Sequence, residues 1–184
     1  RIKYFLPDST IASVDQINYD DLQRVSKISR YDKVENEEKF KLAYFSEFSY
    51  PSIDSIIELR FLEYYSFERP YKDIYLFDSI GNVKEKQSFY YGAGYPYLSS
   101  EFIYTDMKRA FDGLNLPIYE IAHDRFQLHE VFSRNHSVGF RNYKYENDSV
   151  RVGIGSREQE WEYDEKGYPI SRDETVFYYY TELN

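Results

Sequence analysis

The sequence predicts an all-β fold: a curved antiparallel meander, or a partly open barrel, of about nine or ten strands. Three observations favour this class: a composition rich in tyrosine, a turn motif that recurs along the chain, and stretches in which apolar and polar residues alternate. The 184 residues include 22 tyrosines and 14 phenylalanines, but one tryptophan and one methionine. Aromatic rings pack across neighbouring strands, and the hydroxyl of tyrosine suits a half-solvated sheet face.

The recurring motif consists of an aromatic residue, an aspartate and a turn residue three positions after the aspartate. It occurs at residues 19–25, 77–83 and 163–169, with a looser copy at residues 145–150. In such a hairpin the aspartate carboxylate accepts a hydrogen bond from the backbone N–H two residues later, and a glycine takes a positive φ angle. The turn residues predicted in this way are Asp20, Asp78, Gly81, Asp164 and Gly167. Gln23 replaces the glycine in the first copy, where a left-handed conformation costs roughly 1 kcal/mol, so we expect a longer or differently shaped turn there.

Between the turns, residues 40–44 and 57–61 alternate with a period of two, as expected of strands with one buried and one wetter face. Residues 176–180 are aromatic or apolar at both parities, which predicts a strand with both faces partly covered. Pro51 and Pro70 lie where one apolar run ends and the next begins, in turns rather than strand interiors. Residues 111–135 are the exception, because their pattern predicts a loop and a short helix that cover an edge or end of the sheet.

Length, charge and cysteine content limit the function classes. We expect residues 1–184 to form a single domain, because domains usually have roughly 100–200 residues. No apolar run approaches the roughly 18 residues that a membrane-spanning helix needs. A formal net charge of −9 argues against nucleic acid as a partner. The absence of cysteine excludes disulfides, thiolate metal sites and a cysteine nucleophile.

The order of these hairpins resembles a group of secreted lipoproteins of Bacteroidetes-type bacteria. The segments that carry the resemblance are residues 111–114, 129–135, 147–150 and 162–169. The group has a porin-like curved antiparallel meander and no assigned function or catalytic residues. The resemblance implies export to the periplasm or the outer surface of a bacterial envelope. It also implies a signal or lipoprotein leader upstream of Arg1, with a lipid anchor there as the protein's only membrane contact.

Two groups of residues suggest chemistry, and for both we prefer a structural interpretation. His123, His129 and His136 are spaced by six and seven residues, so no pair has the i, i+4 spacing of helical metal ligands. Glu158, Glu160 and Glu162 are predicted to share one side of a strand, with Gln159, Trp161 and Tyr163 on the other. Paired carboxylates are the machinery of glycoside hydrolases, but a solvated row of strand charges explains these glutamates more simply. We expect no enzyme activity, no metal and no cofactor.

The best binding candidate is the aromatic segment at residues 89–97, which two glycines and a proline interrupt. Rings held on a loop can stack against sugars or apolar groups. The predicted ligand-binding residues are Tyr90, Tyr91, Tyr95, Tyr97 and Trp161. The alternative is that Tyr91 and Tyr97 end strands that pack on the core, with a wide Gly-Ala-Gly turn between them.

The function predicted on these grounds is that of a non-enzymatic, exported envelope protein whose tyrosine-rich curved sheet binds a glycan, an apolar ligand or another envelope protein. Three alternatives stay open. A carbohydrate-binding module requires exposed rings in a row. A carrier of an apolar ligand requires a contiguous apolar cavity, and a hydrolase requires two carboxylates in one cleft.

Overall fold

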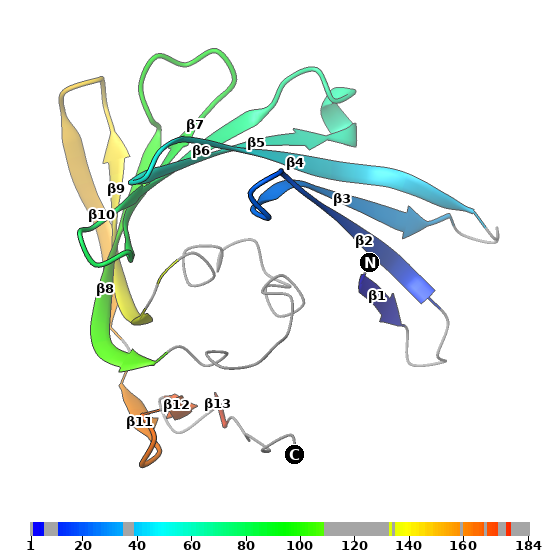
Figure 1. Cartoon of the computed structure of the whole chain (residues 1–184). Helices are drawn as coiled ribbons and strands as arrows, with labels where there is room; N and C mark the ends of the chain where they lie inside the picture. Colours follow the sequence, from blue (N-terminus) through cyan, green and yellow to red (C-terminus); the bar gives the residue numbers. More distant parts are fainter. Residues whose placement is uncertain are drawn as a thin grey trace. The chain divides into compact units, whose positions relative to one another are not determined.

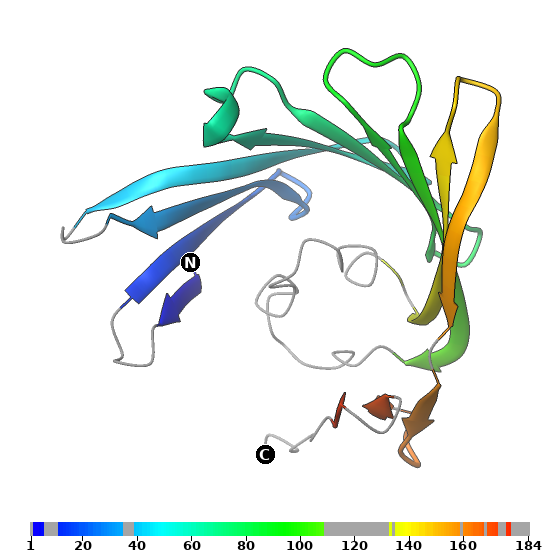
Figure 2. The ribbon, with the colours of Figure 1, turned by 180° about the vertical axis from the view of Figure 1, so that it is seen from behind.

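The computed structural model describes residues 2–5, 11–34, 39–108, 133, 135–158, 160–167, 169–172 and 176–177. It confirms the predicted all-β antiparallel meander, since ten strands follow one another in the sheet in the order of the sequence (Figure 1). They are β1 (Ile2–Phe5), β2 (Ile11–Tyr19), β3 (Val25–Lys33), β4 (Phe40–Ser52), β5 (Ser55–Leu62), β6 (Tyr71–Phe77), β7 (Val83–Phe89), β8 (Leu98–Lys108), β9 (Asn135–Tyr145) and β10 (Arg151–Glu158). Within the described residues β1 and β10 are the two ends of this order, so the sheet is open (Figure 2).

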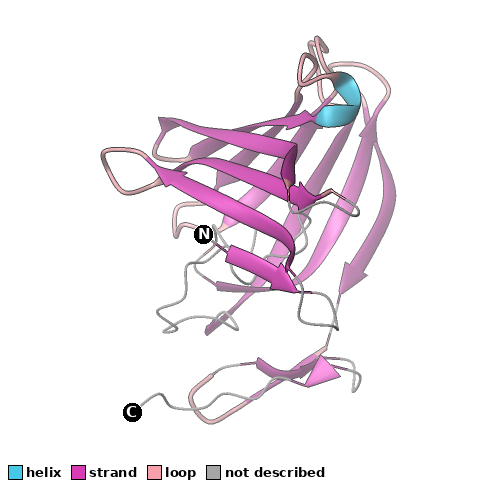
Figure 3. Ribbon diagram, turned by 90° about the vertical axis from the view of Figure 1, so that its right-hand side faces the viewer, coloured by secondary structure: helices cyan, strands magenta, loops and turns pink. Residues whose placement is uncertain are grey.

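A second, three-stranded antiparallel sheet follows in the sequence. Its strands are β11 (Trp161–Tyr163), β12 (Pro169–Arg172) and β13 (Val176–Phe177). Helix in the described part is confined to one 3₁₀ turn, η1 (Glu63–Tyr65), which Figure 3 colours separately from the strands. No helical segment of this part has the length and apolar character needed to cross a bilayer. The predicted insertion at residues 111–135 lies outside the described residues, apart from Ser133 and Asn135.

Contacts divide the chain into two compact units. Unit 1 comprises Arg1–Ile74 and Ser88–Pro96, and unit 2 comprises Tyr75–Gln87 and Tyr97–Asn184. Strands β6 and β7 each contribute residues to both units.

The predicted turns have the predicted shape. Gly81 and Gly167 have φ angles of 91° and 82°, and the N–H of each donates to the carbonyl of Asp78 or Asp164, at 3.2 and 2.9 Å. The Asp78 carboxylate also accepts hydrogen bonds from the N–H groups of Ile80 and Asn82, at 3.0 and 2.9 Å. These bonds supply partners to backbone donors that the turn would otherwise leave unsatisfied.

The expectation of a different first turn is wrong. Gln23 takes the left-handed conformation itself, with φ 60°, and its N–H donates to the Asp20 carbonyl at 3.0 Å. The Asp20 carboxylate accepts hydrogen bonds from the N–H groups of Leu22 and Arg24, at 2.9 and 2.8 Å, and from the Arg24 side chain. These bonds offset the roughly 1 kcal/mol cost of a left-handed glutamine, so the motif keeps its shape without glycine.

In unit 1 one face of the sheet carries buried charge, and we call it the polar face. Register places Asp15 opposite Arg30 and Ser46 opposite Arg60 on this face. Glu58 lies on the same face two residues before Arg60, and Asp73 accepts a hydrogen bond from Arg60. Glu58 is 1% exposed. It accepts a hydrogen bond of 2.6 Å from the Ser46 hydroxyl and lies 3.3 Å from Nε of Arg60. The alternation predicted for residues 57–61 is therefore confirmed, but the charged side is the more deeply buried one.

The opposite face of unit 1 carries Phe45 and Phe61, whereas Phe48 lies on the polar face, opposite Glu58. Phe45 on β4 and Phe61 on β5 are paired in register, and their rings stack with centroids 4.5 Å apart. Phe67 tilts against Phe45 at 5.7 Å, and the Lys27 ammonium lies 3.9 Å from the centroid of the Phe45 ring. Apolar contact between these rings fixes the segment that follows β5 against the sheet.

In unit 2 a buried polar cluster holds Ser133 and Asn135, the first residue of β9. The Ser133 hydroxyl accepts a hydrogen bond from the Val83 N–H at 2.8 Å, and the Tyr104 hydroxyl donates to the Val83 carbonyl at 2.9 Å. The Asn135 N–H donates to Oδ1 of Asn82 at 2.8 Å. Val83 is fully buried, so these bonds satisfy backbone groups that water cannot reach.

Candidate ligand-binding site

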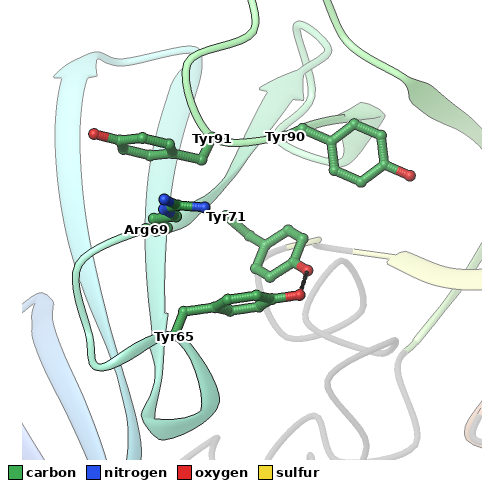
Figure 4. Close-up of a pocket in the computed structure, with 5 residues that line it drawn as sticks. All are labelled: Tyr65, Arg69, Tyr71, Tyr90 and Tyr91. Carbon is green, nitrogen blue, oxygen red and sulfur yellow. Dashed lines mark hydrogen bonds between the residues drawn. The ribbon is translucent and has the colours of Figure 1, made fainter.

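Unit 1 contains a cavity of about 220 Å³ lined by four tyrosines and one arginine (Figure 4). Tyr65 ends η1, Arg69 lies in the connection between η1 and β6, and Tyr71 is the first residue of β6. Tyr90 and Tyr91 come from the connection between β7 and β8. In an antiparallel meander, turns on alternate hairpins lie at the same end of the sheet, so these two connections become neighbours.

The backbone after η1 is held in an unusual conformation. Ser66 and Phe67 both have left-handed φ angles, 51° and 59°, although neither is glycine. The Ser66 N–H donates to the Glu63 carbonyl at 2.7 Å, and the Phe67 N–H to the Leu62 carbonyl at 3.1 Å. This pair of bonds is the Schellman pattern that closes the end of a helix.

Phe67 explains why the left-handed pair persists. Its ring packs against Phe45, which itself stacks on Phe61, so apolar contact on the sheet offsets the backbone cost of roughly 1–3 kcal/mol for each strained residue. The turn thereby reverses the chain and places Tyr65 and Arg69 on the same cavity. Strained backbone of this kind is concentrated at functional sites.

The tyrosines form a connected aromatic cluster. The Tyr71 hydroxyl donates to the Tyr65 hydroxyl at 3.2 Å, and the ring centroids of these residues lie 5.9 Å apart. Tyr71 also meets Tyr90, with centroids 6.5 Å apart. Tyr90 and Tyr91 are 56% and 62% exposed, so much of both side chains is open to a ligand.

Among the described residues that line the cavity, Arg69 is the one that carries a charge, and none is a carboxylate. Figure 4 draws its guanidinium between the ring of Tyr91 and that of Tyr65. Ring faces, phenolic hydroxyls and a guanidinium can pack against a ring-shaped molecule and bond its polar edge. None of these groups forms the nucleophile and base pair of a hydrolytic site.

The structure brings together part of the predicted site. Tyr90 and Tyr91 line the cavity, whereas Tyr95, 40% exposed on the same loop, does not. Tyr97 lies in unit 2, where its carbonyl accepts a hydrogen bond of 3.2 Å from the Tyr145 N–H. Trp161 is half-buried on β11, also in unit 2.

The Gly-Ala-Gly segment forms the turn that the structural alternative proposed. The Ala93 N–H donates to the Tyr90 carbonyl at 3.1 Å, and Gly92 has φ 72°. Tyr91 is nevertheless exposed and does not pack on the core. The loop is therefore a turn that presents tyrosine rings.

Sequence reasoning missed Tyr65, Arg69 and Tyr71. A signal was present, because residues 63–71 hold four aromatic residues, an arginine and a proline between two predicted strands. A meander makes the connections before β6 and after β7 neighbours in space, so the two aromatic segments could have been combined.

The predicted row of glutamates does not exist as a single strand face. Glu158 ends β10, Glu160 lies between strands, and Glu162 is on β11 in the other sheet. All three are exposed to solvent, so none of them has the buried environment of a catalytic acid. His123 and His129 lie outside the described residues. Within the described part no three residues of the His, Cys, Asp and Glu types gather as metal ligands would.

No protein-family model matches this sequence, and a comparison with curated proteins finds none that is significantly similar to it.

Proposed function

We propose that the protein is a non-enzymatic binding protein of a bacterial cell envelope, and that its tyrosine-lined cavity binds a carbohydrate ring. The observation that carries this proposal is the meeting of Tyr65, Tyr71, Tyr90 and Tyr91 around one cavity of about 220 Å³. Tyrosine combines an apolar ring face with a hydroxyl that donates and accepts, and a sugar offers C–H groups on one face and hydroxyls at its edge.

The cavity is pre-organised for a ligand. The Tyr65 and Tyr71 hydroxyls already bond each other at 3.2 Å, and the connection before Tyr71 is closed by two backbone hydrogen bonds. Tyrosine also loses little side-chain freedom on binding because it has two rotatable side-chain bonds. A sugar that enters therefore orders little protein, and more of the contact energy appears as affinity.

The alternatives fit this cavity less well. An apolar ligand would leave the guanidinium of Arg69 and several hydroxyls facing hydrocarbon, and unsatisfied polar groups are costly to desolvate. A hydrolase would need two carboxylates with different environments, but the described part of the cavity lining contains none. Envelope location follows from the family resemblance of the hairpins, and cell fractionation of the native organism would test it.

Binding can be tested on a glycan array, followed by isothermal titration of the glycans that bind. Tyr90→Ala and Tyr71→Ala should each weaken binding about tenfold or more, since stacking and hydrogen bonding are both lost. Tyr19→Ala is the matched control, because Tyr19 is a tyrosine of similar exposure, 49%, at the end of β2.

Circular dichroism and thermal unfolding of all three variants would show that they are folded. Glycan binding that survives both cavity substitutions, or that Tyr19→Ala weakens equally, would contradict the proposal. The absence of binding to any glycan on the array would also count against it.

A further inference from the structure

We propose that the cavity selects an acidic sugar, a hexuronate whose carboxylate pairs with Arg69. The inference rests on the proposed function and specifies its ligand class. Arg69 is then the residue that determines specificity, while the tyrosines supply the platform for the sugar ring.

The first reason is the pairing of the other arginines in unit 1. Each of the remaining three that the structure describes forms an ion pair of 2.7 Å within the chain. These pairs are Arg24 with Asp20, Arg30 with Asp15, and Arg60 with Asp73. Within the described part of the chain Arg69 forms no such pair, and no carboxylate shares its cavity. A guanidinium that forms no ion pair within the described part of the chain is available to an anionic ligand.

The second reason is the shape of the two groups. A guanidinium presents a planar fork of N–H donors that matches the two oxygens of a carboxylate. Figure 4 draws this fork between the rings of Tyr91 and Tyr65. A pyranose that packs on these tyrosines would project the carboxylate at C6 in the plane of its own ring, within reach of the guanidinium.

The third reason is the rigidity of the segment that holds Arg69. The left-handed pair Ser66 and Phe67 precedes it, and the Glu68 N–H donates to the Tyr65 carbonyl at 3.0 Å. Pro70 follows it, and a proline restricts the backbone of the residue before it to extended conformations. The backbone of Arg69 is therefore restricted, so pairing of its guanidinium costs less backbone entropy than pairing on a mobile loop would.

The test compares trigalacturonate with the same trisaccharide fully methyl-esterified, which keeps the rings and removes the charge. We expect the parent protein to bind the acid about tenfold or more tightly than the ester by isothermal titration. Arg69→Gln should reduce affinity for the acid to that for the ester. Arg24→Gln, at an exposed arginine of another hairpin, should leave both affinities unchanged.

Two results would overturn the inference: equal binding of acid and ester by the parent, including no binding of either, or an unchanged preference in Arg69→Gln. The proposed function fails on a different result. If the parent binds a neutral glycan and Tyr90→Ala abolishes that binding, the carbohydrate proposal stands while the acidic specificity is wrong. If Arg69→Gln loses the preference for the acid but Tyr90→Ala binds both sugars normally, the anion site is correct and the aromatic platform is wrong.

Discussion

Arg60 on β5 and Asp73 on β6 form a buried ion pair between neighbouring strands, with Nη2 of the arginine 2.7 Å from Oδ2 of the aspartate. The side chains are 18% and 6% exposed. Arg60 also lies 3.3 Å from a Glu58 oxygen, so one guanidinium forms ion pairs with two carboxylates that are almost fully buried.

Replacing Arg60 with methionine should therefore destabilise the protein by about 3 kcal/mol, since two buried carboxylates lose their cation. Urea unfolding at neutral pH would measure the change. Lys41→Met is the matched control, because Lys41 pairs with Glu63 while its own side chain is 67% exposed, and it should cost less than about 1 kcal/mol. Equal losses in the two variants would show that burial of the Arg60 network does not matter.

At equivalent positions of the turn motif, two substitutions should change the stability of the fold in opposite directions. Gly167→Ala should destabilise by about 1 kcal/mol, because a left-handed alanine is strained. The cost is conformational, since among the described residues the added Cβ would come within 4 Å of Met107 Sδ alone, at 3.6 Å. Gln23→Gly should stabilise by up to about 1 kcal/mol, because it relieves the same strain. Thermal unfolding of both variants checks this, and a change of the same sign in both would refute it.

Gly139 should be intolerant of any side chain. A Cβ there would lie 2.6 Å from the backbone oxygen of Arg157 and 3.1 Å from Cα of Glu158, so β10 would have to move. Gly139→Ala should cost about 1–3 kcal/mol as measured by urea unfolding. Gly153→Ala on β10 is the control, because no atom of the described residues lies within 4 Å of its added Cβ. A loss at Gly153 as large as that at Gly139 would exclude the steric explanation.

Glu101 should give unit 2 a measurable dependence of stability on pH. Burial raises the pKa of this carboxyl, but the hydrogen bonds from Arg151 and Tyr143 outweigh it and lower the pKa below the ordinary value of 4.5. Those bonds measure 2.6 and 3.0 Å. A lowered folded-state pKa stabilises the fold above the unfolded pKa, and this contribution is lost as pH falls through the folded value.

Tyr143→Phe removes one of the two donors, so the pKa of Glu101 should rise toward 4.5 and the acid-induced loss of stability should shrink. Carbon-13 NMR titration of the carboxyl group would report the pKa, with Glu101→Gln to assign the signal. Tyr19→Phe should leave the titration unchanged. A Glu101 titration that is identical in the parent and in Tyr143→Phe would contradict the role of the hydroxyl.

Local chemistry made the fold predictable. An aspartate followed three positions later by glycine defines a turn through contacts within five residues, and Gly81 and Gly167 have the positive φ angles that this requires. The alternation of residues 57–61 likewise predicted β5. It did not predict which side of β5 is buried, because the partners that neutralise Glu58 and Arg60 include Ser46 and Asp73 on neighbouring strands.

The site was half predictable for the same reason. Tyr90 and Tyr91 were found because their segment is conspicuously aromatic. Tyr65, Arg69 and Tyr71 lie beside them because two connections some 20 residues apart in the sequence pack together. The interest of Arg69 is that the described cavity lining contains no carboxylate to pair with it. Sequence patterns report neighbours along the chain, whereas a cavity is made by neighbours in space.

The last strand of the main sheet has a consequence for how the protein behaves at high concentration. Every residue of β10 is exposed, and the strand pairs with β9 alone in the described part of the chain. Its outer backbone groups, with Val152 and Ile154 at 45% and 58% exposure, offer a template on which another chain could add a strand. Two features disfavour such strand addition. They are the register shift between Gly153 and Gly155 and the charges of Arg151 and Arg157. A strand added at this edge would pair with β10, which takes no part in the described lining of the cavity.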